Sequence, residues 1–234
     1  MEVKVLDDPA QACAEMLCEA AEAGAHIALT GGSTPRIAYE RAAAMGADWS
    51  RAKLWFGDER CVPPADELSN YRLAKDALLD RLPPLGGGGP EVHRMRGESG
   101  PHAGADDYAL ELRDALGEHA PRLDVVLLGL GPDAHVASLF PGHATLDVRD
   151  RTVVGEEVAG HEPFVPRISM TLPVLCAGRR IVFLVTGEGK ADAVDRSFSH
   201  GREPSHDAPG SLVRPTNGEL TLLLDAAAAS RLRT

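Results

Sequence analysis

Two residues that can act together in acid–base chemistry follow a predicted buried strand. They are Asp133 and His135, in the segment GLGPDAHVASLFPG. A histidine serves as a general base when it is neutral, accessible and oriented, and a carboxylate two residues away can orient it. The residues alone leave an alternative open. In that alternative Asp133 caps a short helix from Ala134 to Phe140, and His135 is an incidental surface histidine.

A possible phosphate site lies in TGGSTP (30–35), between a predicted strand and a predicted helix. Gly31 and Gly32 allow the backbone to approach a ligand closely, and Ser33 and Thr34 offer hydroxyl groups. The free amides at the start of a helix favour a bound phosphate. The alternative is a tight turn with an ordinary Ser/Thr cap, because the segment is not a GxxxxGK[ST] loop.

Three cations stand at predicted element boundaries beside glycine or proline. They are Arg60 in FGDERCVP, Arg167 in FVPRISMTLP and Lys190 in VTGEGKADA. Each one taken alone is an ordinary solvated charge. Brought to one edge of a sheet, the three would form a local positive pocket, which the formal net charge of −11 does not otherwise provide.

Other chemistries find less support in the sequence. GLGPDA satisfies the dinucleotide pattern GxGxxG/A, but no strand with an acidic end follows at the required distance, and Pro132 lacks an amide that a pyrophosphate would need. No GxSxG is present, so Ser33 and Ser138 lack the usual nucleophile elbow. Without HExxH or another dense ligand cluster, we expect no metal and no redox cofactor.

The composition indicates an ordinary soluble globular protein, with 44% hydrophobic and 25% charged residues. The acidic balance disfavours nucleic acid as a partner. The sequence contains no run of about 18 apolar residues, so we expect no membrane span. The N-terminus has neither a secretory nor a transit pattern. The four cysteines form no CxxC, so we expect reduced thiols and a cytoplasmic protein.

Aliphatic strands alternate with helices along the chain. Strands are predicted at 26–30, 53–57, 123–129, 152–159, 179–187 and 218–225, and helices at 7–23, 33–43, 69–82, 102–118, 134–140, within 171–178, at 190–198 and at 226–232. This rhythm is typical of an α/β fold with a mainly parallel sheet covered by helices on both faces. PPLGGGGP (83–90) is predicted to be a surface loop, so residues 1–234 are expected to form one domain.

The glycine-rich turns indicate where a ligand binds. They fall at the predicted strand ends, at Gly31–Gly32, Gly57, Gly129–Gly131 and Gly187–Gly189. In parallel sheets, ligands bind beyond the carboxyl ends of the strands. We therefore expect these turns to converge on one edge of the sheet and to form the site there.

Several motifs together resemble one known family. LTGGSTP, LWFGDERCVP with SNY (69–71), GLGPDAHVASLFPG, PRISMTLP, FLVTGEGK and SLVRP occur in an order and spacing similar to those of 6-phosphogluconolactonases, over about residues 5–225. The resemblance implies a modified Rossmann-like fold, shared with glucosamine-6-phosphate deaminases, ribose-5-phosphate isomerases and CoA transferases. It also implies hydrolysis of 6-phospho-D-glucono-1,5-lactone to 6-phospho-D-gluconate, the second step of the oxidative pentose phosphate pathway.

The resemblance also implies residue roles. His135 would deprotonate the attacking water and return the proton to the ring oxygen, with Asp133 orienting it. The GGST turn (31–34), Arg60, Arg167 and Lys190 would hold the phosphate and stabilise the developing oxyanion. The division of these tasks among the cations stays open, and Arg60 is counted with the catalytic residues as well. The expected partner is a small phosphosugar lactone, the expected cofactor none, and the expected state a monomer or weak homodimer.

One departure from the family pattern concerns the catalytic segment. The family usually has Asp-Gly-His, whereas this chain has Ala134 between the two catalytic residues. If that backbone requires a positive φ, alanine costs roughly 1 kcal/mol and can alter the loop; if it does not, the change is harmless, and we expect the second case. PPADELSNY also lacks the histidine often found in that loop, so no contact of such a histidine is carried over.

Two other functions remain to be compared with the lactonase. Sugar-phosphate isomerases and deaminases of this fold carry a carboxylate five residues after the histidine, where this chain has Phe140. A phosphosugar-binding module of a transcription regulator would carry a helix-turn-helix segment and a basic face, which we do not find in the sequence. A binding-only protein remains possible only through loss of activity at Ala134.

Overall fold

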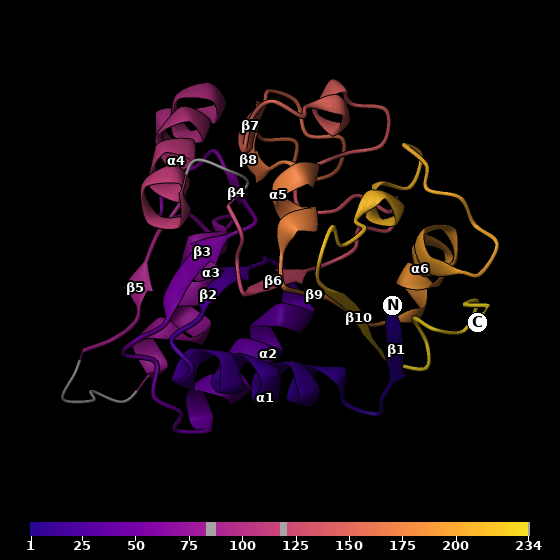
Figure 1. Cartoon of the computed structure of the whole chain (residues 1–234), viewed down its shortest axis with the longest axis horizontal. Helices are drawn as coiled ribbons and strands as arrows, with labels where there is room; N and C mark the ends of the chain where they lie inside the picture. Colours follow the sequence, from indigo (N-terminus) through magenta and orange to yellow (C-terminus); the bar gives the residue numbers. More distant parts are fainter. Residues whose placement is uncertain (83–87, 118–120, 234) are drawn as a thin grey trace.

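The computed structural model describes residues 1–82, 88–117 and 121–233. Within them, seven parallel strands form a central sheet in the order β1-β10-β9-β6-β2-β3-β5 (Figure 1). Their bounds are β1 Glu2–Val5, β2 His26–Leu29, β3 Lys53–Phe56, β5 Glu91–Val92, β6 Val125–Leu128, β9 Arg180–Val185 and β10 Glu219–Leu224. The prediction of an α/β fold with a mainly parallel sheet is confirmed.

Helices cover both faces of this sheet, as predicted. Their bounds are α1 Pro9–Glu22, α2 Ser33–Ala44, α3 Asn70–Ala77, α4 Pro101–Leu116, α5 Leu172–Ala177 and α6 Ala191–Phe198. In Figure 1, α1 and α2 lie below the sheet, and α4, α5 and α6 lie above it. No helix of the described residues is long and apolar enough to cross a membrane.

The alternation of side chains along the strands explains why both faces need a cover. In β6, Val125 and Leu127 pack in the core under α1, α2 and α3, whereas Val126 and Leu128 pack in the core under α4, α5 and α6. β9 (180–185) is divided between the two cores in the same way. A strand that is apolar at every position is therefore buried on both sides, which is why the aliphatic runs were recognisable in the sequence.

A second sheet was not expected. It is antiparallel, in the order β4-β8-β7, with bounds Asp58–Arg60, Arg167–Met170 and Val153–Glu156. Only the last of these strands was predicted, because β4 and β8 are short and have no clear apolar–polar alternation. This sheet packs against α4, where an added Cβ on Gly155 would lie 2.6 Å from the carbonyl of Pro101. It brings Arg60 and Arg167 side by side as paired residues.

The helix predicted from Ala134 to Phe140 is wrong. Ala134 and Ala137 have φ of +71° and +49°, values that a right-handed helix does not contain. The chain forms tight turns instead, and the first is closed by a 2.9 Å bond from the Ala134 amide to the Gly131 carbonyl. His135 therefore lies in a strained loop rather than on a helix.

The helix predicted at 226–232 is also wrong. The carboxylate of Asp225 accepts hydrogen bonds from the amide of Ala228 at 2.7 Å and from the amide of Gly187 at 3.0 Å. These bonds fold the alanine-rich segment into turns against the end of β9. The other predicted helices are present, with ends shifted by a few residues. Residues 83–87 of the predicted loop and residue 118 of the predicted helix at 102–118 lie outside the described residues.

Glu59 in β4 joins the second sheet to α3. Its Oε1 accepts bonds from the amides of Arg60 and Asn70, both at 2.7 Å. Its Oε2 accepts bonds from the hydroxyl of Ser69 at 3.0 Å and the amide of Tyr71 at 2.8 Å. One buried carboxylate thus holds the start of α3, and so fixes Asn70 at the edge of the sheet.

Replacing Glu59 by glutamine tests this cap. An amide nitrogen cannot accept hydrogen bonds, so two buried donors lose their acceptor, at about 1–3 kcal/mol each. We expect Glu59→Gln to lower the free energy of unfolding, measured by urea denaturation, by about 3 kcal/mol. The matched change Glu15→Gln, on the exposed face of α1, should cost less than about 0.5 kcal/mol. Equal effects of both substitutions would contradict the cap.

Candidate active site

A cavity of about 250 Å³ lies at the carboxyl edge of the central sheet, where the turns after β2, β6 and β9 meet. From β2 the chain continues to β3 on one side, and from β6 it continues to β9 on the other, so the cavity lies at a topological switch point. The lining residues are Thr30, Gly31, Gly32, Ser33, Thr34, Pro35, Asp58, Arg60, Asn70, Gly129, Leu130, Gly131, Pro132, His135, Ala137, His161, Glu162, Leu184, Val185, Thr186 and Lys190.

The predicted convergence of the strand-end turns is confirmed for the turns after β2 and β6, whose glycines line the cavity. The turn after β9 contributes Thr186 and Lys190. Gly57, after β3, lies behind the lining, where its amide donates to the carbonyl of Leu29 at 2.9 Å. Its neighbour Asp58 reaches the cavity instead.

His135 and Asp133 form a hydrogen-bonded pair. The distance from His135 Nδ1 to Asp133 Oδ1 is 2.6 Å, and the same oxygen accepts from the His135 amide at 3.2 Å. An ionised carboxylate only accepts, so Nδ1 carries the hydrogen and Nε2 is left as the basic atom. Burial acts to raise the pKa of Asp133, but the hydrogen bond and charge of His135 outweigh it and lower that pKa to about 2. Asp133 is therefore ionised at neutral pH.

Gly131 allows the loop to close around this pair. Its amide donates to the carbonyl of His135 at 2.9 Å. A Cβ at this position would lie 2.1 Å from His135 Nδ1 and 2.5 Å from Asp133 Oδ1, closer than atoms approach. The glycine is needed here for space, since the side chains of the pair occupy the volume that any larger residue would fill.

Ala134 meets the condition under which alanine was expected to cost energy, because its φ is +71°. The left-handed backbone costs roughly 1 kcal/mol for a residue with a Cβ. The Ala134 methyl group is fully buried in the core, and burial of one such group returns about 0.8 kcal/mol. The two terms nearly cancel, so alanine and glycine should be similarly stable at this position.

A second set of bonds attaches the loop to the antiparallel sheet. The hydroxyl of Ser138 donates to Asp58 Oδ2 at 2.7 Å, and its amide donates to the hydroxyl of Ser169 at 3.2 Å. Asn70 Nδ2 donates to Asp58 Oδ1 at 3.1 Å, so both carboxylate oxygens are used. An added Cβ on Gly31 would lie 2.0 Å from Asn70 Oδ1, which accounts for the glycine there.

Asp58 and Asn70 are cavity residues that the sequence analysis missed. Both belong to quoted motifs, GDER and SNY, but neither was given a role. Asp58 lies just after β3, and Asn70 is the first residue of α3. Such a position at an element boundary is the signal that singled out Arg60, and it could have singled out these two residues as well.

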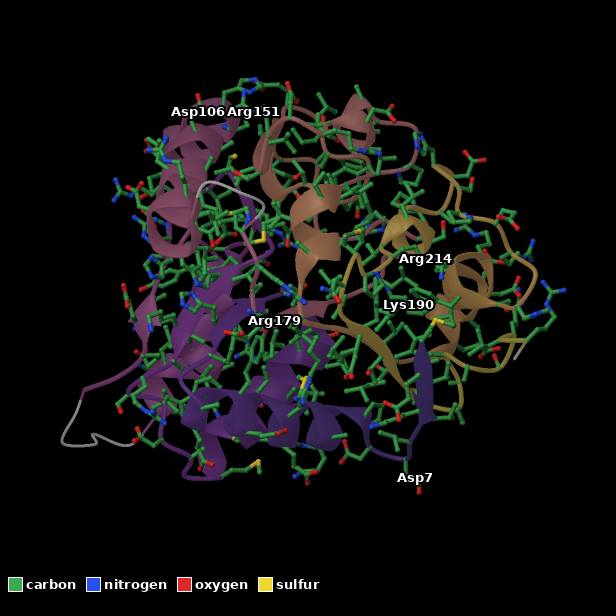
Figure 2. All side chains as sticks on the ribbon, in the orientation of Figure 1. Asp7, Asp106, Arg151, Arg179, Lys190 and Arg214 are labelled. Atoms are coloured by element: carbon green, nitrogen blue, oxygen red, sulfur yellow. The ribbon has the colours of Figure 1, made fainter. Side chains whose placement is uncertain are left out.

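Arg60 and Lys190 provide the positive charge of the cavity. Neither has a carboxylate within 4 Å among the described residues, in contrast to Arg151, for example, which is paired with Asp106 (Figure 2). Arg60 Nη1 donates only to the carbonyl of Leu68, at 2.8 Å. Burial lowers the pKa of Lys190, against the opposing effect of Asp133. Two cations without partner carboxylates in one cavity favour an anionic ligand.

The GGST turn (31–34) also lines the cavity. Gly32, with φ of +115°, is the N-cap of α2, and no side chain caps this helix. The first amides of a twelve-residue helix are therefore available beside the cavity. The hydroxyl of Thr34 lies 2.7 Å from that of Thr186, which ties this turn to the one after β9.

Arg167 was predicted to share the phosphate site, but it is not among the residues that line the cavity. It is 3% exposed, and its guanidinium donates to the carbonyls of Pro163 at 2.7 Å and Val165 at 3.1 Å. Burial and the charge of Arg60 lower the pKa of Arg167 to about 10, so it stays protonated at neutral pH. The structure thus brings together every predicted site residue at the cavity wall except Arg167 and Asp133, which lie behind it.

His161 and Glu162 line the cavity although the sequence analysis assigned them nothing. The ring centroid of His161 lies 5.4 Å from that of His135. No group of three or more His, Cys, Asp or Glu side chains within the described ranges is arranged to hold a metal ion.

The fold and the cavity together indicate an α/β enzyme with a histidine–carboxylate pair beside two cations that lack partner carboxylates. The sequence model of the family "Glucosamine-6-phosphate isomerases/6-phosphogluconolactonase" matches residues 3–222, and the chain belongs to this family.

Similar proteins agree with this assignment. A 6-phosphogluconolactonase of Streptomyces coelicolor is 40% identical over 229 residues, 92% of this chain and 84% of that protein. The Homo sapiens 6-phosphogluconolactonase is 39% identical over 214 residues, 88% of this chain and 80% of that protein. The solved 6-phosphogluconolactonase of Trypanosoma cruzi superimposes with a TM-score of 0.81 at 26% identity, covering 99% of this chain and 96% of that one. A monomeric glucosamine-6-phosphate deaminase, 20% identical with a TM-score of 0.80, shares the fold.

Gly131→Ala tests how the loop holds the pair of Asp133 and His135. Because the new methyl group would overlap both side chains, we expect the distance from His135 Nδ1 to Asp133 Oδ1 to exceed 3.5 Å in a crystal structure. The downfield proton NMR signal of the hydrogen on Nδ1 should be lost. Gly189→Ala, where an added Cβ has no atom within 4 Å, should leave both observables unchanged. A preserved pair in Gly131→Ala would contradict the packing argument.

Proposed function

We propose that this protein hydrolyses 6-phospho-D-glucono-1,5-lactone to 6-phospho-D-gluconate, in the oxidative pentose phosphate pathway. The observation that carries the proposal is the 2.6 Å bond between His135 Nδ1 and Asp133, beside a cavity that two cations without partner carboxylates line. A base with its free nitrogen next to an anion site suits a phosphorylated substrate that water must attack.

The reaction needs one base and modest electrostatic help. His135 Nε2 takes a proton from water as the water oxygen bonds to the lactone carbonyl carbon, and the carbonyl becomes a tetrahedral oxyanion. The ring carbon–oxygen bond then breaks, and the imidazolium returns the proton to the leaving ring oxygen. Asp133 holds the ring and stabilises its positive charge. Backbone amides and a cation at the oxyanion lower the barrier further.

The phosphate is held at the start of α2, in our proposal. The GGST turn provides amides and hydroxyls, and Lys190 and Arg60 provide charge. Arg60 also stabilises the oxyanion. Arg167 does not line the cavity and supports the wall through its bonds to the carbonyls of Pro163 and Val165. The four free thiols suit the cytoplasm.

The rival reaction, sugar-phosphate isomerisation or deamination, lacks its carboxylate. Phe140 occupies that position, is 1% exposed and packs with its ring centroid 5.0 Å from that of His135. A phenyl ring cannot transfer a proton, so the cavity has no group for ring opening at this place. A non-catalytic binding module is the outcome that the following assay would reveal.

The direct test is hydrolysis of freshly prepared lactone, followed by acid release with and without the protein. We expect acceleration that resists EDTA. His135→Ala should lose about a hundred- to ten-thousand-fold in rate, the usual contribution of a general base, and should still bind 6-phosphogluconate. His206→Ala, an exposed histidine away from the cavity, is the matched control and should keep the full rate.

Each negative result has a definite meaning. No acceleration over the spontaneous rate would reject the lactonase and favour a phosphosugar-binding module. Near-normal activity of His135→Ala would reject this residue as the base while leaving the lactonase in place.

Asp133→Asn tests the orienting carboxylate through the rate. Since the pKa of Asp133 is about 2, this group stays ionised throughout an assay between pH 5 and 9, so its charge is present at every pH of the assay. Asparagine carries no charge and no longer fixes the hydrogen on His135 Nδ1. We therefore expect kcat to fall by about a hundredfold or more across this pH range. An unchanged kcat would contradict the assignment.

A further inference from the structure

The connection between β7 and β8, residues 157–166, forms one wall of the cavity through His161 and Glu162. We call it the β7–β8 segment. It contains no helix or strand, so its course depends on the contacts made at its ends and middle.

Two contacts hold the first half of this segment. Just before it, the carboxylate of Glu156 lies 3.1 Å from His143 Nδ1 and accepts from the hydroxyl of Thr145 at 3.0 Å. Further along, an added Cβ on Gly160 would lie 2.8 Å from Phe140 Cβ and 3.1 Å from His143 Nε2. The backbone before His161 is thus pressed against the loop that carries His135.

Arg167 holds the second half. Its guanidinium donates to the carbonyls of Pro163 and Val165, and no carboxylate lies within 4 Å of it among the described residues. A buried charge is costly unless it is hydrogen-bonded, and here two segment carbonyls provide those bonds. The position of Arg167 therefore suits bracing of the segment rather than contact with a ligand.

The His161 ring is oriented by the backbone of the next residue. Its Nδ1 lies 2.9 Å from the carbonyl oxygen of Glu162. A carbonyl only accepts, so Nδ1 carries the hydrogen, and Nε2 is left as the acceptor of a ring that lines the cavity. Nε2 has no hydrogen-bond partner within the described part of the chain.

The position of His161 indicates which end of a ligand it meets. It lies 5.4 Å, between ring centroids, from the proposed base His135. The neighbouring Glu162 adds a carboxylate to the same wall, and this repels a phosphate. The phosphate end therefore belongs at the cationic wall, and His161 faces the reacting end.

We propose that His161 contacts the substrate, with Nε2 hydrogen-bonded to the hydroxyl on the carbon next to the lactone carbonyl, and that Arg167 is the positioning residue that holds it there. This rests on the proposed lactonase reaction. At the reacting end the carbonyl and the water are used by the proposed oxyanion site and His135. The hydroxyl on the adjacent carbon is the polar group that remains.

The test compares two ligands that differ only in this hydroxyl, 6-phosphogluconate and 2-deoxy-6-phosphogluconate, by calorimetric titration. We expect the wild-type protein to bind the hydroxylated compound about tenfold more tightly, the size of one good hydrogen bond. His161→Ala should reduce this preference to less than about twofold. His206→Ala is the matched control and should keep it.

Arg167→Ala should reduce the same preference although the residue does not line the cavity, and Arg167→Lys, which can keep one bond, should retain part of it. General destabilisation would weaken both ligands equally and leave the ratio unchanged, so the ratio separates positioning from folding. If Arg167→Ala does not fold, Arg167→Lys tests the positioning role instead. A ratio of the two affinities below that of the wild-type protein would then support this role, and an unchanged ratio would contradict it.

An unchanged ratio in His161→Ala would overturn the contact, and so would a wild-type protein that does not prefer the hydroxylated compound. The lactone assay is a separate measurement. A wild-type protein without lactonase activity would reject the proposed reaction. The ratio of the affinities for the two ligands would still show whether His161 contacts this hydroxyl.

Discussion

The hydrogen bond between Asp133 and His135 is the interaction on which the rest of the site depends. It fixes the tautomer of the imidazole and therefore which nitrogen is basic. It forms only because the chain between the two residues passes through a left-handed backbone at Ala134 and because Gly131 leaves the space for both side chains. The glycine-rich turn at the end of β6 thus serves the geometry of two side chains as much as the approach of a ligand.

The antiparallel sheet explains how such a strained loop persists. A loop with two left-handed alanines needs fixed contacts on several sides. Asp58 in β4 accepts from Ser138, and Glu59 beside it holds the start of α3, so one short strand supports both the loop that carries His135 and Asn70. The sheet that the sequence did not reveal is therefore the main support of the site.

The sequence was sufficient for features that follow from long patterns. The aliphatic strands and the glycine turns were predictable, since burial on both faces and close ligand approach each restrict residue type. The sequence was not sufficient where a single tertiary contact determines the backbone conformation or the place of a side chain. The backbone at Ala134 turns left-handed although alanine favours a helix, and Arg167 is drawn inward by two carbonyls that no motif marks. His161 could not be found either, because its place depends on a segment of 157–166 without regular structure.

Phe140 packs between two parts of the site. Its ring is buried between those of His135 and His143, with centroids 5.0 and 5.5 Å away. A carboxylate in this apolar place would be costly to ionise, and it would add negative charge close to Asp133. The phenyl ring instead supports the imidazole and the backbone of Gly160. Phe140 thereby supports both His135 and the segment that carries His161.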